Sequence, residues 1–125
     1  TRFPESMGQP STPLVIADAS ANIALVHGEP MLAWRDFDLS EHEAQLRLNG
    51  EIVDAGAGNK VLGNPLNSLA WLAAFLDRQG LSLKRGDLIT TGTVTDMRPV
   101  EIGDEVEADF GALGEAKVAF VAATD

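Results

Sequence analysis

The sequence predicts an α+β domain in which several short strands accompany one main helix at about residues 65–79. Residues on both sides of the Asn-Gly pair at 49–50 alternate between apolar and polar types, as half-buried strands do. Farther along the chain the period changes from two to that of a helix. Four apolar residues there recur at spacings of three and four: Leu69, Leu72, Ala73 and Leu76.

The strands are predicted from apolar or alternating runs bounded by turn residues. They fall at 14–17, 21–26, 44–48, 51–54, 88–91, 105–110 and 116–121. Asn-Gly between two such runs is typical of a tight hairpin, because both central residues need positive φ. The simplest register of this hairpin places Leu46 opposite Val53 on one face.

The helix has clear start and stop residues. Asn64 is a good N-cap and Pro65 suits the first helical position, while Gly80 is the natural residue to follow the last turn. Trp71 and Phe75 form a second apolar pair, four residues apart. Such a helix is expected to be buried on more than one side.

Composition limits the function. The chain has 125 residues, enough for one domain, and a formal net charge of −10. A surface this acidic repels nucleic acids and anionic membranes, so neither is an expected partner. There is no cysteine, which excludes disulfides and thiol catalysis and suits a cytoplasmic protein. No apolar run reaches the length of a membrane span.

The residues that could bind a ligand are few. The segment 90–95 (TTGTVT) brings hydroxyls and a glycine to a strand end, where they could hold a carboxylate. Threonines are also simply frequent in strands, and that alternative stays open. Ser20 lies in a polar break between apolar runs, either as a site residue or as part of a turn. Lys60 could bind an acidic group or be solvated.

Two acidic clusters could suggest metal binding. His42 stands between Glu41 and Glu43, which fits either a metal patch or a solvated turn. Acidic residues also alternate with apolar ones along 105–110. Strand alternation explains that second cluster as the outer face of a strand, and we favour this interpretation over a cation site.

Longer motifs resemble those of the fumarylacetoacetate hydrolase superfamily. The run 61–72 (VLGNPLNSLAWL) resembles its G-x-P-L-x-A-x-x-W-L-A segment, and 83–93 (LKRGDLITTGT) its L-x-x-G-D-x-I-x-T-G strand. Residues 99–104 (PVEIGD) resemble its P-V-x-x-G-D ending, and 16–20 (IADAS) its I-A-D-N-A-S segment, with a departure at the Asp-Asn pair. The form of the first run is similar to the 2-keto-4-pentenoate hydratase and 4-oxalocrotonate decarboxylase branch.

This resemblance implies a mixed β-roll or sandwich of the C-terminal-domain type, present over 1–125 as a single partial domain. It implies a lyase (a hydratase or decarboxylase) or a C–C hydrolase that acts on 2-oxo acids in aromatic compound catabolism. Members of the family use Mg²⁺ or Mn²⁺, and their reactions pass through enol or enolate intermediates. Thr91, Gly92, Thr93 and, less directly, Ser20 are then the substrate-binding residues. The family's metal-binding carboxylates match positions upstream of Thr1, so we expect this chain alone not to bind the metal.

Two hypotheses follow. The chain is the C-terminal part of a hydratase-like enzyme, or it is a truncated, non-catalytic remnant that binds a small molecule or oligomerises. A half-domain exposes strand edges, which predicts a homo-oligomer in either case. The sequence identifies no catalytic residue.

Overall fold

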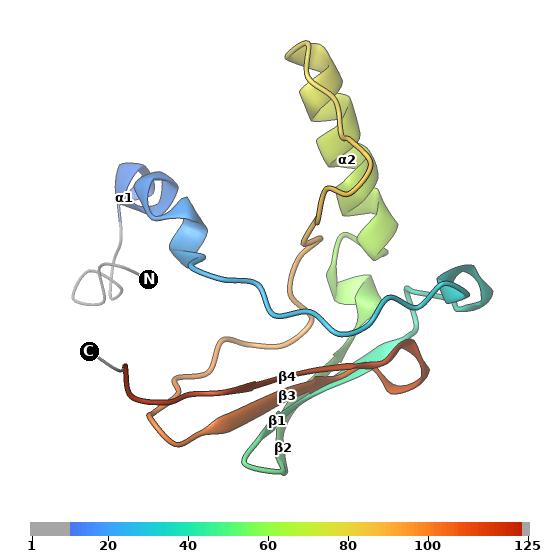
Figure 1. Ribbon diagram of the computed structural model, residues 1–125. Helices are drawn as coiled ribbons and strands as arrows, with labels where there is room; N and C mark the ends of the chain where they lie inside the picture. The colour runs from blue at the N-terminus through green and yellow to red at the C-terminus, as the bar shows by residue number, and fades with distance from the viewer. Residues whose placement is uncertain (1–10, 124–125) are drawn as a thin grey trace.

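A computed structural model describes residues 11–123 of the chain. A four-stranded antiparallel sheet forms the base of the molecule, in the order β2-β1-β3-β4 (Figure 1). Its strands are β1 (Glu43–Leu48), β2 (Glu51–Ala57), β3 (Glu105–Asp109) and β4 (Glu115–Ala119). One main helix, α2 (Pro65–Arg78), accompanies the sheet, which confirms the predicted α+β class.

The hairpin forms at the predicted Asn-Gly pair, with φ of 52° at Asn49 and 84° at Gly50. Its predicted register is wrong. Leu46 pairs with Asp54 and Arg47 with Ile52, so Val53 is an extra residue in a bulge of β2. A bulge puts two residues of one strand opposite one of its partner, which simple alternation in the sequence does not reveal.

The ends of α2 are those predicted. The Asn64 side chain accepts a hydrogen bond from the Leu66 amide at 2.9 Å. At the other end Gly80 has a φ of 69°, and the amide of Leu81 donates to the Leu76 carbonyl at 2.9 Å. This pattern, a 6→1 bond with a left-handed glycine, is a Schellman ending.

The expected burial of α2 is not found. The helix projects away from the sheet, and residues 81–90 return along it (Figure 1). No residue of the helix is buried, and Trp71 is 59% exposed. The leucine stripe is half-buried, but the Trp71–Phe75 stripe lies on another side of the helix and is exposed. Within residues 11–123, no helix is long and apolar enough to cross a membrane.

Three of the predicted strands are absent from the described part of the chain. Residues 14–17 lie in a short helix, α1 (Thr12–Ala17), which has Pro13 in its first turn. A 3-10 turn, η2 (Ala19–Ala21), follows it, and 22–26 are irregular. Residues 88–91 are also outside the sheet. An apolar run becomes a strand only when another strand pairs with its backbone, and these runs have no such partner here.

Two further 3-10 turns lie on either side of the hairpin, η3 (Trp34–Asp36) before it and η4 (Gly58–Lys60) after it, and a third, η5 (Gly111–Leu113), joins β3 to β4. Among residues 11–123, the buried hydrophobic side chains are Ala44 on β1 and Val61 just after η4. The small core therefore sits where β1, η4 and the segment after residue 90 meet.

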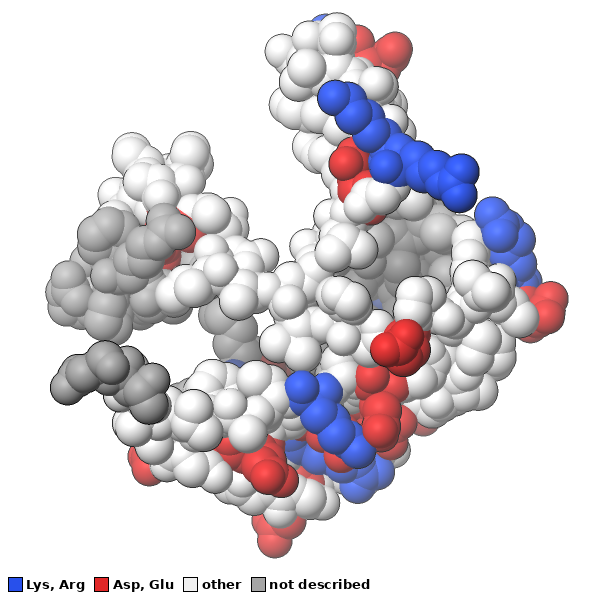
Figure 2. All heavy atoms as spheres, in the orientation of Figure 1, with Lys and Arg blue, Asp and Glu red and all other residues white. Residues whose placement is uncertain are grey.

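The outer face of β3 is acidic, as predicted, and cations of both neighbouring strands lie on it. Arg47 of β1 contacts Glu107 at 3.7 Å and Asp109 at 3.5 Å. Lys117 of β4 contacts Glu107 at 3.4 Å and Glu115 at 3.0 Å. Figure 2 shows acidic and basic side chains interleaved over the part of the surface where the sheet lies.

Candidate functional site

A cavity of about 220 Å³ lies over the small core. It is largely apolar, and two of the predicted substrate-binding residues, Thr91 and Gly92, are in its wall. The lining residues are Leu39, His42, Ala44, Gly58, Val61, Pro65, Thr91, Gly92, Val94, Phe110 and Leu113. The sheet, η4, the start of α2 and the 91–94 segment therefore meet around one space.

Side chains, rather than a strand ladder, hold the segment after Gly92 against β2. Lys60 Nζ donates to the carbonyl of Val94 at 3.0 Å and to that of Ala55 at 3.3 Å. The amide of Asp96 donates to Asp54 Oδ2 at 2.8 Å. The sequence left open whether Lys60 binds an acidic group or is solvated. In the structure its ammonium group connects β2 to the cavity wall.

Asp54 is the electrostatic centre of this attachment. The amides of Asp96 and Ala55 donate to its carboxylate and lower its pKa, and the nearby charges of Arg98 and Lys60 act in the same direction. Arg98 Nη2 lies 3.7 Å from Asp54 Oδ2 and also donates to the Val53 carbonyl at 2.9 Å. The bulge residue and its neighbour therefore both receive bonds from the segment that follows the cavity.

Gly92 is required at its position for two reasons. Its φ is 143°, a conformation that side chains with a Cβ rarely adopt. A Cβ built on it would also lie 2.9 Å from Val61 Cγ1, a buried group that cannot move away freely. The bare backbone at Gly92 thus forms part of the cavity wall.

The other two predicted substrate-binding residues do not line this cavity. Thr93 is exposed, and its hydroxyl donates to the Thr95 carbonyl at 2.6 Å, which closes a local turn. Ser20 is exposed in η2 with φ of 60° and ψ of 40°. The structure therefore brings together Thr91 and Gly92, and leaves Thr93 beside them and Ser20 elsewhere.

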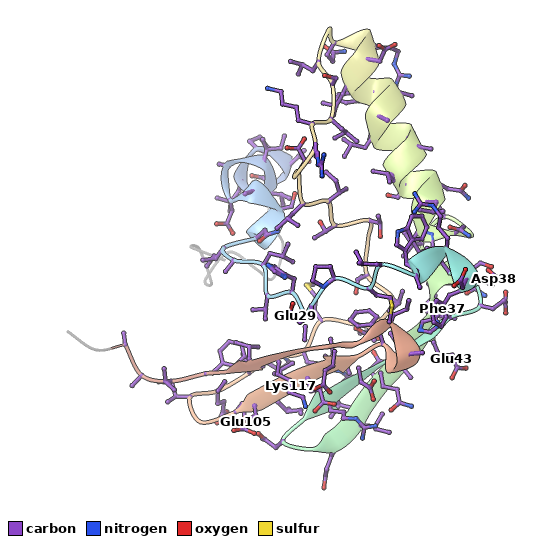
Figure 3. The ribbon with its side chains drawn as sticks, turned by 45° about the vertical axis from the view of Figure 1, so that its right-hand side comes forward. Glu29, Phe37, Asp38, Glu43, Glu105 and Lys117 are labelled. Atoms are coloured by element: carbon purple, nitrogen blue, oxygen red, sulfur yellow. The ribbon has the colours of Figure 1, made fainter. Side chains whose placement is uncertain are left out.

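His42 is the polar residue that sequence reasoning did not place in the cavity. Its Nε2 lies 2.6 Å from the Phe110 carbonyl oxygen and therefore donates a proton to it, and its ring meets Phe37 edge-on at 5.6 Å. Figure 3 shows Phe37 on the turn that leads to Glu43, the first residue of β1. The signal was the alternation of β1: His42 and Ala44 share one face, and Ala44 is buried.

The described residues do not make a metal centre. Glu41 and Glu43 are exposed on either side of His42, and among residues 11–123 no three His, Cys, Asp or Glu side chains come together as a metal would require. The donor set present therefore does not fit Mg²⁺ or Mn²⁺. What the cavity offers is an apolar space with the hydroxyl and backbone of Thr91 and Gly92 at its wall.

Comparison with known families and proteins gives one consistent result. The family model described as fumarylacetoacetate (FAA) hydrolase C-terminal matches residues 4–121. The chain is 35% identical over 105 residues to a 2-keto-4-pentenoate hydratase of Paraburkholderia phymatum, covering 84% of this chain and 40% of that protein. It is 36% identical over 107 residues to a 4-oxalocrotonate decarboxylase of Pseudomonas putida, covering 86% and 40%.

Solved structures agree in fold. The 4-oxalocrotonate decarboxylase of Pseudomonas putida G7, complexed with magnesium and adipate, matches with a TM-score of 0.78 and 34% identity over 87% of this chain and 42% of that one. The same enzyme complexed with calcium and acetate matches equally well. The chain thus spans about 40% of the length of the curated relatives it matches.

Proposed function

The chain belongs to the fumarylacetoacetate hydrolase C-terminal family, and we propose that it is a hydratase-like protein of 2-oxo acid metabolism in aromatic compound catabolism. The observation that carries this proposal is the position of Thr91 and Gly92 in the wall of a 220 Å³ cavity. They belong to the very motif that resembles the family's substrate-binding strand end. The relatives named hydratase and decarboxylase support the same substrate class.

The site would hold a small 2-oxo acid by its polar end. The Thr91 hydroxyl and the backbone at Gly92 and Thr93 can donate to a carboxylate or an oxo group, and the apolar wall suits a short hydrocarbon chain. Ser20 is proposed as a further substrate-binding residue on the strength of its motif alone. In this proposal residues 1–125 form one partial domain, and the four-stranded sheet is a part of the roll or sandwich typical of the family.

The divalent cation of the relatives' structures would be held by carboxylates other than those of residues 11–123. When bound, such a cation polarises an oxo group and neutralises a carboxylate. This chain would contribute the substrate-binding wall of the shared site. The second candidate function is a non-catalytic protein that binds a small molecule or oligomerises. Location in the cytoplasm remains a prediction from composition.

Nuclear magnetic resonance tests the site directly. The ¹⁵N-labelled chain is titrated with 2-oxopentanoate, the saturated analogue of 2-keto-4-pentenoate, with and without Mg²⁺. We expect the amide signals of 91–93 to shift in both series, because the groups that hold the ligand belong to this chain. Shifts confined to other regions, or no saturable shift, would contradict the proposal.

Turnover separates the two candidate functions. The chain is incubated with 2-keto-4-pentenoate and Mg²⁺ or Mn²⁺, and loss of the substrate's ultraviolet absorbance is followed. Binding without turnover is expected for the chain by itself, because its described residues lack a metal centre. Metal-dependent hydration would show that the donor set is complete and would overturn that part of the proposal.

A further inference from the structure

The segment that carries the candidate substrate-binding residues has no backbone ladder to hold it in place. Among residues 11–123, no backbone-to-backbone hydrogen bond reaches residues 88–100, and none of the four strands includes them. The position of this segment in the cavity wall therefore depends on the side chains that bond to its backbone and on the groups against which it packs.

Lys60 makes the long-range bond that lies nearest to the substrate-binding residues. Its ammonium group donates to the carbonyl of Val94, which lines the cavity, at 3.0 Å. The other long-range bonds of the segment belong to Asp96 and Arg98, which are beyond the residues that line this cavity. The bond from Lys60 is thus the one that acts directly on the cavity wall.

The backbone that carries Lys60 is itself well anchored. Lys60 is the last residue of η4, and Gly58 at the start of this turn is buried. The Gly58 amide donates to the His42 carbonyl at 3.1 Å, and the Asn59 amide donates to the Ser40 carbonyl at 2.7 Å. Lys60 therefore joins the cavity wall to an element that is fixed to the turn before β1.

The next residue, Val61, supports the same wall from the core side. Val61 is buried, and a Cβ built on Gly92 would lie 2.9 Å from Val61 Cγ1. Two successive residues thus hold the wall at two points, Gly92 by packing and Val94 by a hydrogen bond. The backbone between these points, which includes the Thr93 amide, is held at both ends.

The charge of Lys60 suits it to bridge two segments. Its ammonium group donates to the Ala55 carbonyl of β2 at 3.3 Å as well as to Val94. A charged donor makes a stronger hydrogen bond than a neutral one, and an ammonium group has three protons to donate. Gly56 leaves room for this bridge, since a Cβ there would lie 2.8 Å from Lys60 Nζ. The bridge therefore requires a long side chain with several charged donors.

From these observations we infer that Lys60 is a positioning residue of the candidate site, which sets ligand affinity through the Val94 carbonyl without touching the ligand. Lys60 is outside the lining of the cavity, so it is not a catalytic residue. Its effect on affinity rests on the proposed function. Its effect on the position of the wall does not.

Amide spectra of three ¹⁵N-labelled variants test this inference. Lys60→Met keeps the aliphatic stem and loses the donor, so the signals of 91–94 should move. Affinity for 2-oxopentanoate should weaken about tenfold, the effect of one hydrogen bond to a charged group. Lys60→Arg keeps the charge and several donors, and should restore most of the lost affinity. Lys84→Met, the matched control, removes the same charge from an exposed position after α2 and should change neither the signals nor the affinity.

The two measurements separate this inference from the proposed function. If the unmodified chain does not bind 2-oxopentanoate, the proposed function fails, and the signals of 91–94 in Lys60→Met still decide whether Lys60 positions the wall. Unmoved signals or an unchanged affinity in Lys60→Met would overturn the inference, and so would a Lys60→Arg variant that binds no better. If Lys60→Met does not fold by circular dichroism, Lys60→Gln, which is neutral and shorter than lysine, takes its place with the same expected results.

Discussion

Gly56 on β2 and Val94 beside the cavity are in direct backbone contact: a Cβ on Gly56 would overlap the Val94 carbonyl oxygen and also approach Lys60 Nζ to 2.8 Å. The same carbonyl accepts the Lys60 hydrogen bond. The missing side chain at one position of β2 thus allows the segment from Thr91 onward to close over the core. The shape of the candidate site depends on this contact.

Gly56→Ala should therefore disturb the site and the fold together. The Val94 carbonyl is backbone and cannot rotate away, so the segment must shift, at a cost of about 1–3 kcal/mol in the free energy of unfolding. Urea unfolding measures this cost, and amide spectra should show signals of 91–96 displaced. If the Gly56→Ala variant were as stable as the unmodified chain, with those signals in place, the contact would be looser than described.

Gly80→Ala is the matched control for this substitution. Gly80 has a φ of 69° with open space around it, so the added methyl costs only the left-handed conformation, about 1 kcal/mol. It should destabilise the chain without moving the signals of 91–96. The two alanine variants thereby separate loss of stability from displacement of the cavity wall.

The N-cap of α2 gives a second prediction. Asn64→Ala removes the acceptor of the Leu66 amide and should lower the free energy of unfolding by about 1 kcal/mol. Because α2 has no buried residue, packing stabilises it little, and the cap bond is correspondingly important. Thermal unfolding followed by circular dichroism measures it. Asn64→Asp keeps an acceptor and adds a negative charge at the helix start, so it should restore stability. Equal losses in both variants would contradict a capping role.

Stability should also depend on pH through Asp54. Its pKa is lowered in the folded chain, chiefly by the Asp96 amide, so its contribution is present above the pKa of the unfolded chain and is lost as pH falls through the lowered value. We expect the melting temperature to fall on acidification below about pH 4. Asp38 and Asp104, whose pKa values are also lowered by hydrogen bonds, act in the same direction.

Asp54→Asn isolates the share of that one carboxyl. The variant should be less stable at neutral pH and should lose less stability on acidification than the unmodified chain. Parallel curves of melting temperature against pH would assign the acid sensitivity to the other carboxyls.

Local signals predict those parts of the fold that local chemistry determines. Asn64 and Gly80 act through bonds within a few residues, so both can be recognised from the sequence, and both are found. The Asn-Gly turn at 49–50 is recognised by its residue types, which suit positive φ, although the Asn49 side chain bonds to Asp104 and to the Glu105 amide far along the chain. The bulge at Val53 could not be recognised, because the groups that bond to Val53 and Asp54 there belong to Arg98 and Asp96, 45 and 42 positions away.

Burial and strand pairing were misjudged for a different reason. Periodicity in 14–17, 88–91 and α2 indicates that a surface is apolar, but does not say which other segment covers it. In the described chain no strand pairs with 88–91, and Trp71 of α2 is 59% exposed. The cavity shows the same division: Thr91 and Gly92, which the motif singles out, and His42, which it does not, lie together in the wall only through the fold.

The Thr91 hydroxyl gives the last prediction, which concerns ligand binding. Thr91 is half-buried in the cavity wall, while the Thr93 hydroxyl is already engaged with the Thr95 carbonyl. Thr91→Val keeps the volume and removes the donor, so binding of 2-oxopentanoate should weaken about tenfold, the effect of one hydrogen bond to a charged group. Thr93→Val, the matched control, removes a hydroxyl that is already bonded to the Thr95 carbonyl and should leave affinity within about twofold, because Thr93 would serve through its backbone amide. The affinities are measured by the amide titration described above. If Thr93→Val weakened binding more than Thr91→Val, the ligand would lie on the outer side of the segment, away from the cavity.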